Sequence, residues 1–179
     1  MSSSPVQQFS VPASAAVAAM QRNRVDHVVT VPDWVQLALH QRLEAGVPGV
    51  RLVNCSSENQ VVTVGAGLVI GGKRPLLVMQ NQGLYNCINT LRAVCLDAKV
   101  PLVFMVGQFG REFDNLGQPS TASRRTMVRI MEPLLQSIGV PFLCLDGEQD
   151  LPLMDEAFAM AEQQSGAVVL LVSAPMAWA

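Results

Sequence analysis

The sequence predicts an α/β fold: a doubly wound, mainly parallel six-stranded sheet with helices on both faces. Short apolar runs of strand length alternate along the chain with longer segments of helical periodicity. This alternation is typical of parallel sheets, whose strands are buried on both faces. The chain has 179 residues, half of them apolar, which is enough for one domain with a core of its own. We expect this domain to span residues 13–179, after a flexible N-terminal tail at 1–12.

The first part of the domain contains two predicted helix–strand pairs. Alanines and larger apolar residues share one side of a helix at 13–24, and the apolar run at 26–31 is the first strand. Apolar residues four positions apart predict a helix at 34–43, for which Asp33 is a candidate N-cap. The second strand is predicted at 50–54, after a turn that contains two glycines.

The central part carries the next helix, two strands and another helix. A helix is predicted from Glu58 to a stop at Gly71-Gly72. The apolar run at 75–79 is the third strand, and a polar turn leads from it to a helix at 84–97. The fourth strand is predicted at 102–106.

The last part begins with an irregular segment. Residues 107–123 are polar and glycine-punctuated, and loops of this length in compact domains are usually functional or disordered. A helix at 124–138, a strand at 142–145, a helix at 151–164 and a strand at 167–172 complete the predicted sheet.

Composition limits the classes of partner. Only 15% of the residues are charged and the net charge is −2, which argues against binding to nucleic acid or an anionic membrane. No apolar run approaches the ~18 residues of a membrane-spanning helix, and the N-terminus lacks the basic region of a signal peptide. Four cysteines without a CxxC pair, and two histidines not spaced as ligands with them, argue against zinc. We expect a cytoplasmic protein.

Two polar features stand where an α/β sheet binds ligands. Glu58 is at the start of a helix, where the helix dipole alone would favour a carboxylate. The segment QNQG at 80–83 follows the third strand, and the carboxyl ends of parallel strands form the binding crevice of such sheets. Each feature also has a purely structural explanation, as a first-turn acid and as a tight turn.

Six short motifs follow one another along the chain. They are VPD (31–33), SEN (57–59), GAG (65–67), GGKRP (71–75), MQNQG (79–83) and NCIN (86–89). In this order they resemble the pyrimidine-binding domain of thiamine diphosphate enzymes, in particular the sulfopyruvate and phosphonopyruvate decarboxylases. The resemblance extends from about residue 25 to residue 172, and the ordered set is specific although each motif alone is weak.

The resemblance implies that Glu58 activates the cofactor. A carboxylate hydrogen-bonded to N1′ of the cofactor's aminopyrimidine favours the imino tautomer, whose nitrogen is a base beside thiazolium C2. The resemblance also implies that Asn81, Gln82, Gly83 and Asn86 bind the pyrimidine.

Substrate contacts are expected from the first strand's end and from the long loop. Asp33 matches an aspartate that reaches toward substrate, with the helix N-cap as its alternative role. Trp34 stands where the related decarboxylases have a small residue, so their sulfonate or phosphonate specificity does not transfer directly. Gln118 is expected to line the substrate cavity. Arg111 or Arg124 can pair with a substrate anion, although a solvated arginine is the alternative.

The diphosphate-binding half of such a site is missing from this sequence. In the family, a GDG motif followed by an asparagine holds Mg²⁺ and the diphosphate, whereas here the similar run Asp146-Gly147-Glu148 has no asparagine after it. The resemblance therefore implies one subunit of a split enzyme, with no metal ligands of its own. A separate subunit with GDG…N is expected to hold Mg²⁺, in a hetero-oligomer such as α2β2 or larger.

The expected function is that of a pyrimidine-binding subunit in a thiamine diphosphate-dependent 2-oxo acid decarboxylase or C–C lyase. One alternative is a carboligase subunit of the acetolactate-synthase type. A second alternative is a non-catalytic nucleotide-binding module, against which the absence of GxGxxG after the first strand weighs.

Overall fold

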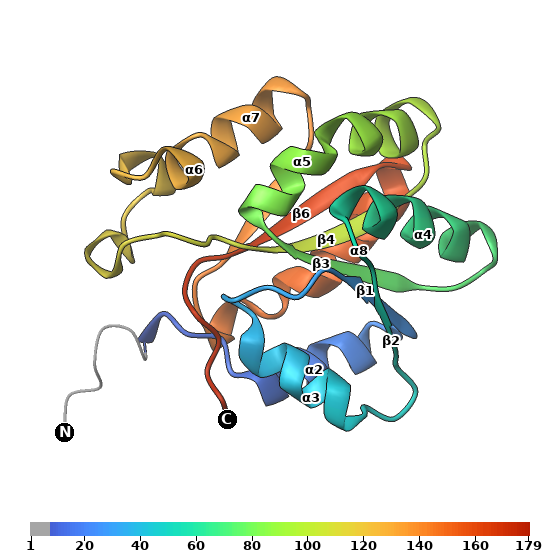
Figure 1. The fold of residues 1–179 in the computed structure, drawn as a ribbon, viewed down its shortest axis with the longest axis horizontal. Helices are drawn as coiled ribbons and strands as arrows, with labels where there is room; N and C mark the ends of the chain where they lie inside the picture. The colour runs from blue at the N-terminus through green and yellow to red at the C-terminus, as the bar shows by residue number, and fades with distance from the viewer. Residues whose placement is uncertain (1–7) are drawn as a thin grey trace.

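The sheet of the computed structural model, which describes residues 8–179, consists of six parallel strands in the order β2-β1-β3-β4-β6-β5 (Figure 1). The strands are β1 (His27–Thr30), β2 (Arg51–Asn54), β3 (Pro75–Gln80), β4 (Leu102–Gly107), β5 (Phe142–Leu145) and β6 (Ala167–Val172). The predicted fold class is confirmed, and each predicted strand is present within two residues of its expected bounds.

Helices cover both faces of this sheet (Figure 1). The α-helices are α2 (Ala13–Arg22), α3 (Leu37–Ala45), α4 (Glu58–Ile70), α5 (Asn81–Leu91), α6 (Thr126–Arg129), α7 (Met131–Ser137) and α8 (Leu153–Gln164). A π-helical segment, η1 (Arg92–Asp97), continues α5, and three short 3₁₀ helices are η2 (Phe113–Asn115), η3 (Ser120–Ala122) and η4 (Glu148–Asp150).

The core has two parts because alternate residues of a strand point to opposite faces of the sheet. In β3, Leu76 and Val78 pack with α2, α3 and α8, whereas Leu77 and Met79 pack with α4, α5 and α7. All four side chains are fully buried. The strands are therefore apolar on both faces, which is why they appear in the sequence as continuous apolar runs.

The helix predicted at 34–43 begins later than expected. Its first residue is Leu37 and its N-cap is Gln36, so Asp33 is not the N-cap. The Asp33 carboxylate instead accepts a hydrogen bond from the amide of Val35, at 2.8 Å, and Trp34–Leu37 forms a turn before the helix. This local side-chain bond keeps the backbone non-helical for three more residues.

Two other helix predictions need correction. The predicted polar turn at 80–83 is mostly helical already, because α5 starts at Asn81 rather than at residue 84. The helix predicted at 124–138 is divided into α6 and α7, and Ile130 is both the C-cap of the first and the N-cap of the second.

The predicted N-terminal tail is only partly described. Residues 1–7 lie outside the described part of the chain. Residues 10–12 are paired with the C-terminal segment: the Ser10 hydroxyl donates to the carbonyl of Pro175 at 2.6 Å, and the Ala177 amide donates to the carbonyl of Val11. Val11 is buried. Among residues 8–179, no helix is long and apolar enough to cross a membrane.

The chain changes direction between β1 and β3. From β1 it moves outward to β2, and then returns to place β3 on the other side of β1. The carboxyl ends of β1 and β3 thus flank a switch point, where open α/β sheets form their binding crevice. α4 follows β2 and α5 follows β3, so both helices begin at this carboxyl edge of the sheet (Figure 1).

Candidate functional site at the carboxyl edge of the sheet

Glu58 is the first residue of α4. Ser57 is its N-cap and accepts a hydrogen bond from the amide of Gln60. The partly buried Glu58 side chain stands at the positive end of the helix dipole, which favours a carboxylate.

The Glu58 side chain packs directly on the backbone of Gly83 in α5. A Cβ atom placed on residue 83 would lie 2.4 Å from Cγ of Glu58 and 2.6 Å from its Oε1. These distances are well below van der Waals contact, so the Glu58 side chain can adopt this position only because residue 83 is glycine. Glu58 and Gly83, which the resemblance places in one cofactor site, are thus in contact.

Asn86, one turn later on α5, holds the same carboxylate from a second side. Its side-chain amide donates to Oε2 of Glu58 at 3.1 Å. Oε1 of Glu58 accepts no hydrogen bond from residues 8–179. Asn59 joins the two helices: its amide donates to the carbonyl of Asn86 at 3.5 Å, and its Oδ1 accepts from the hydroxyl of Thr90.

Asn81 is fully buried and connects three segments of the chain. Its Nδ2 donates to the carbonyls of Phe109, at 3.0 Å, and Met127, at 3.3 Å. Its Oδ1 accepts from the amide of Gln82 at 2.9 Å. The Gln82 side chain is exposed at the start of α5. Asn81 therefore joins the start of α5 to the loop after β4 and to α6, while Gln82 faces outward.

Asp33 lies at the end of β1 with only 1% of its surface exposed. Oδ2 accepts from Nε2 of Gln36 at 2.7 Å, and the Asp33 amide donates to Nε2 of His40 at 3.0 Å. Burial raises the pKa of Asp33, against the opposing effect of the hydrogen bonds from Gln36, Val35 and Gly107. The carboxylate is thus held inside the chain.

Gln36 extends this network to two neighbouring strands. Its Nε2 also approaches the carbonyls of Met79, at 3.3 Å, and Met105, at 3.1 Å. A Cβ atom on residue 107 would lie 2.1 Å from Oδ2 of Asp33, so glycine at the end of β4 makes room for this carboxylate. The ends of β1, β3 and β4 are therefore fixed to one another by polar side chains.

Trp34 is an exposed aromatic residue of this edge. It follows the buried Asp33, and 65% of its surface is accessible. Leu37, in the same turn, is also exposed. An exposed apolar pair beside the switch point is typical of a surface that contacts a ligand or another chain.

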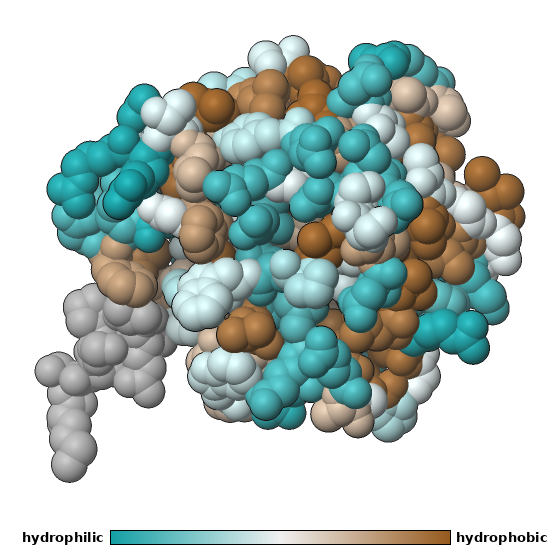
Figure 2. All heavy atoms as spheres, in the orientation of Figure 1, coloured by the Kyte–Doolittle hydropathy of each residue, from teal (hydrophilic) through white to brown (hydrophobic). Residues whose placement is uncertain are grey.

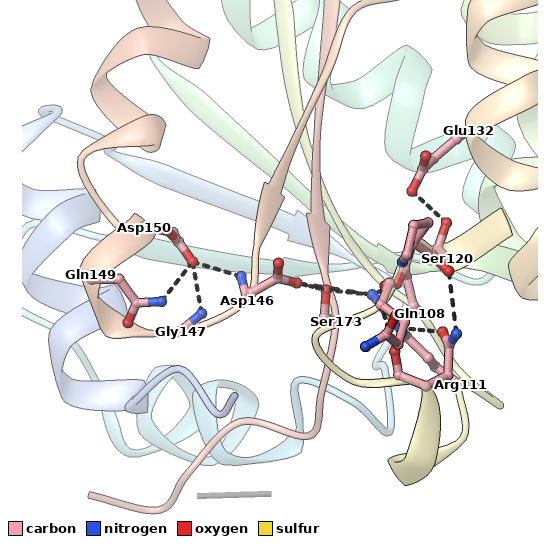
Figure 3. Close-up of polar contacts among 12 residues, drawn as sticks. Gln108, Arg111, Ser120, Glu132, Asp146, Gly147, Gln149, Asp150 and Ser173 are labelled. Atoms are coloured by element: carbon pink, nitrogen blue, oxygen red, sulfur yellow. Dashed lines mark hydrogen bonds and ion pairs between the residues drawn. The ribbon is translucent and has the colours of Figure 1, made fainter. Parts of the chain in front are cut away.

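Arg111 is buried at the start of the loop after β4, with its side chain 4% exposed (Figure 3). Its Nη1 donates to Oε1 of Gln108 and to the Ser173 hydroxyl, both at 2.7 Å. Nε donates to Oδ1 of Asn115 at 3.0 Å, and Nη2 donates to the carbonyls of Asn115 and Gln118. All five N–H groups are used within the chain. Arg111 is thus not a solvated arginine, and an anionic substrate would have to displace one of these bonds.

The remainder of the 107–123 loop is more exposed. The Gln118 side chain is accessible, although its carbonyl is held by Arg111. Arg124 is 75% exposed and donates to Asp114 at 3.0 Å. In the space-filling view, hydrophilic residues gather over α6 and this loop (Figure 2).

Some buried polar atoms at this edge have no hydrogen-bond partner among the described residues. They are Oγ1 of Thr30, Oε1 of Gln36 and Nε2 of Gln108. Each belongs to a residue at or just beyond the end of β1 or β4, so this edge retains capacity for further hydrogen bonds. Across residues 8–179, no group of three or more His, Cys, Asp or Glu side chains is arranged to hold a metal ion.

The structure brings some of the predicted site residues together and separates others. Glu58, Gly83 and Asn86 are in contact, and Asn81 and Gln82 lie at the same helix start. Asp33 and Trp34 follow β1, whereas Arg111 and Gln118 lie in the loop after β4, and β3 separates these two strands. Asn59 and Gln36 are not among the predicted site residues. Each is a polar residue within three positions of a predicted site acid, which is the one local signal that could have indicated them.

No protein-family model matches the chain. It is 22% identical over 167 residues to a sulfopyruvate decarboxylase of Methanosarcina acetivorans, which covers 93% of this chain and 41% of that relative. It is 28% identical over 120 residues to the sulfopyruvate decarboxylase subunit alpha of Methanothermobacter thermautotrophicus, which covers 66% of this chain and 72% of that relative. This chain thus spans less than half the length of the first relative.

A solved structure shares the fold. It is the 2-oxoglutarate:ferredoxin oxidoreductase of Magnetococcus marinus with 2-oxoglutarate, coenzyme A and succinyl-CoA bound. The TM-score is 0.66 at 13% sequence identity, and the match covers 94% of this chain and 30% of the other.

Proposed function

We propose that this chain, which resembles the pyrimidine-binding subunits of thiamine diphosphate-dependent enzymes, activates that cofactor through Glu58 in a 2-oxo acid decarboxylase or C–C lyase. The observation that supports this most directly is the contact between Glu58 and Gly83. A carboxylate at a helix N-terminus lies against bare backbone, with one oxygen hydrogen-bonded and the other free. The names of both curated relatives support the decarboxylase class.

The residues present fit the pyrimidine ring of the cofactor. Oε1 of Glu58, which accepts no hydrogen bond from residues 8–179, can hold the proton at N1′, while Oε2 accepts from Asn86. The backbone of Gly83 offers its peptide groups without a side chain in the way, and the exposed side chain of Gln82 stands beside them. When bound, thiamine diphosphate supplies a carbanion at thiazolium C2 and an electron sink.

The neighbouring residues have supporting roles in this proposal. Asn81 fixes the start of α5 against the loop after β4, so that Gln82 and Gly83 keep their positions. Asp33 is a candidate for approach to substrate, and in the present conformation it positions the turn that presents Trp34. Gln118 is the candidate polar contact from the loop, which Arg111 holds in place.

The diphosphate and Mg²⁺ are assigned here to a partner subunit that carries the GDG…N motif. The name of the Methanothermobacter relative, a subunit alpha, supports a hetero-oligomer. Cofactor sites commonly lie at such boundaries between chains or domains.

Reconstitution with the partner subunit tests the proposal. The complex, supplied with thiamine diphosphate and Mg²⁺, is expected to release CO₂ from a 2-oxo acid, with product analysis to separate decarboxylation from carboligation. Glu58→Gln is expected to lower kcat by about 100-fold or more while cofactor binding persists, since it removes a general acid–base group from a preformed site. A Glu58→Gln complex with wild-type turnover would contradict the proposal.

A further inference from the structure

We infer that Asn86 is the positioning residue of Glu58: its side-chain amide fixes one carboxylate oxygen so that the other is presented to N1′ of the cofactor. This inference rests on the proposed function. It gives Asn86 a role through Glu58, in place of the direct cofactor contact that the sequence predicts.

The geometry around the carboxylate carries the inference. Gly83 and Asn86 are three residues apart on α5 and therefore share one face of the helix. The Gly83 backbone contacts Cγ and Oε1 of Glu58, and Asn86 Nδ2 binds Oε2 at 3.1 Å. These two contacts constrain the side chain at both its stem and its tip.

A glutamate at a helix start needs such a constraint. Its side chain has several rotamers of similar energy, and holding one of them costs conformational entropy. A hydrogen bond to an ionised group is stronger than one between neutral groups and favours the rotamer that makes it. Among residues 8–179, Asn86 is the sole side-chain donor to Glu58.

The backbone of Asn86 is joined to α4. The Asn59 side-chain amide donates to the Asn86 carbonyl, and the Thr90 hydroxyl donates to Oδ1 of Asn59. Asn59 therefore links the first turn of α4 to α5 beside the Glu58–Asn86 bond. These links set the position of the helical residue that carries the donor.

Two substitutions distinguish positioning from packing. Asn86→Ala removes the donor, and Asn86→Asp keeps the shape but places a second carboxylate against Glu58. Asn89→Ala is the matched control, because Asn89 is exposed one turn later on α5 and its Oδ1 accepts from Arg92 instead. All variants are made in the full chain and studied in the complex with the partner subunit.

Two readouts other than turnover are measured. The first is the rate of hydrogen–deuterium exchange at thiazolium C2 of bound thiamine diphosphate. The second is the Kd of an analogue in which N1′ is replaced by carbon, divided by the Kd of thiamine diphosphate. Asn86→Ala is expected to slow exchange about tenfold and to shrink the Kd ratio, since an ionic hydrogen bond is lost. Asn86→Asp is expected to slow exchange further, and Asn89→Ala to leave both readouts unchanged.

A double-mutant cycle with Glu58→Gln completes the test. If Asn86 acts through Glu58, adding Asn86→Ala to Glu58→Gln causes no further loss of exchange. Wild-type exchange in both Asn86 variants, or losses that add in the double variant, would overturn the inference alone. Wild-type exchange in Glu58→Gln would instead overturn the proposed function.

Discussion

Gly83 is the residue whose substitution separates function from folding most cleanly. A methyl group at this position meets the side chain of Glu58, which can swing away, and no backbone atom is among its nearest neighbours. Alanine is also the better helix former by about 1 kcal/mol. Gly83→Ala is therefore expected to keep the free energy of unfolding within about 1 kcal/mol of wild type and to lose cofactor activation, as measured by urea unfolding and C2 exchange.

Gly67→Ala is the control for this substitution. Gly67 lies in α4, and a Cβ atom on it would meet nothing within 4 Å. We expect unchanged exchange at C2. Equal exchange rates in Gly83→Ala and wild type would show that the close approach to Glu58 is not required for activation.

His40 is expected to make stability depend on pH. Burial lowers the pKa of His40 from 6.5 to about 4. Its Nε2 accepts from the Asp33 amide, a bond that requires the neutral ring. Between pH 6.5 and about 4, the unfolded state binds a proton that the folded state does not. The contribution of neutral His40 to the free energy of unfolding is thus fully present above pH 6.5. Roughly 3 kcal/mol of it is lost as the pH drops toward 4.

Urea unfolding across this pH range measures the effect, with His40→Gln as the comparison. Glutamine retains an acceptor for the Asp33 amide but does not titrate, so its profile is expected to be flatter. The raised pKa of Asp33 acts in the opposite direction, because a carboxyl with a raised pKa is destabilising above about pH 4. If the free energy of unfolding varied with pH in the same way in His40→Gln and in wild type, the pH dependence could not be assigned to His40.

At the scale of elements, Arg111 joins the ends of three adjacent strands. Its partners Gln108 and Ser173 follow β4 and β6, and the Ser173 hydroxyl donates to Asp146, which follows β5 (Figure 3). Asp150 then accepts from the amides of Asp146 and Gly147 at 2.9 Å. The carboxyl edge is thus held by a polar network on this side as well.

Removing the arginine should loosen this edge. Arg111→Met is expected to lower the free energy of unfolding by roughly 3 kcal/mol, because buried acceptors lose their donor. Residues 107–123 are expected to become more susceptible to native-state proteolysis. Arg124→Met, at an exposed position, is expected to change neither measurement. Equal behaviour of the two variants would contradict the account of Arg111.

The sequence was most informative about the strands and least about helix starts. Continuous apolar runs such as those of β3 and β6 identify strands directly, because both sheet faces are covered. The start of α3 could not be predicted. It depends on the hydrogen bonds that the Asp33 carboxylate accepts from Val35, Gln36 and Gly107, and Gly107 is distant in the sequence.

The candidate site was predicted in the same uneven way. Glu58 and Gly83 were identified by the order of the motifs, and the structure places them in contact. One of the hydrogen bonds that occupy the Arg111 guanidinium goes to Ser173, which lies 62 residues later in the chain. No local sequence pattern indicates such a contact. The bridge that Asn59 forms to α5 is likewise a tertiary contact.

At the scale of the whole molecule, the candidate site residues lie along the carboxyl edge of the sheet. α4 and α5 both start there, and Glu58, Gln82 and Trp34 are among the side chains that remain accessible. The oxidoreductase with which the chain shares its fold is much longer, since the match covers 94% of this chain and 30% of the other. Under the proposed function, the partner's diphosphate-binding face meets this edge.

A structure of the complex with thiamine diphosphate bound tests this account most directly. We expect the pyrimidine ring between the two subunits, with N1′ about 2.7 Å from Oε1 of Glu58 and Oε2 still held by Asn86. A pyrimidine ring bound elsewhere, or Glu58 facing solvent in the loaded complex, would contradict it.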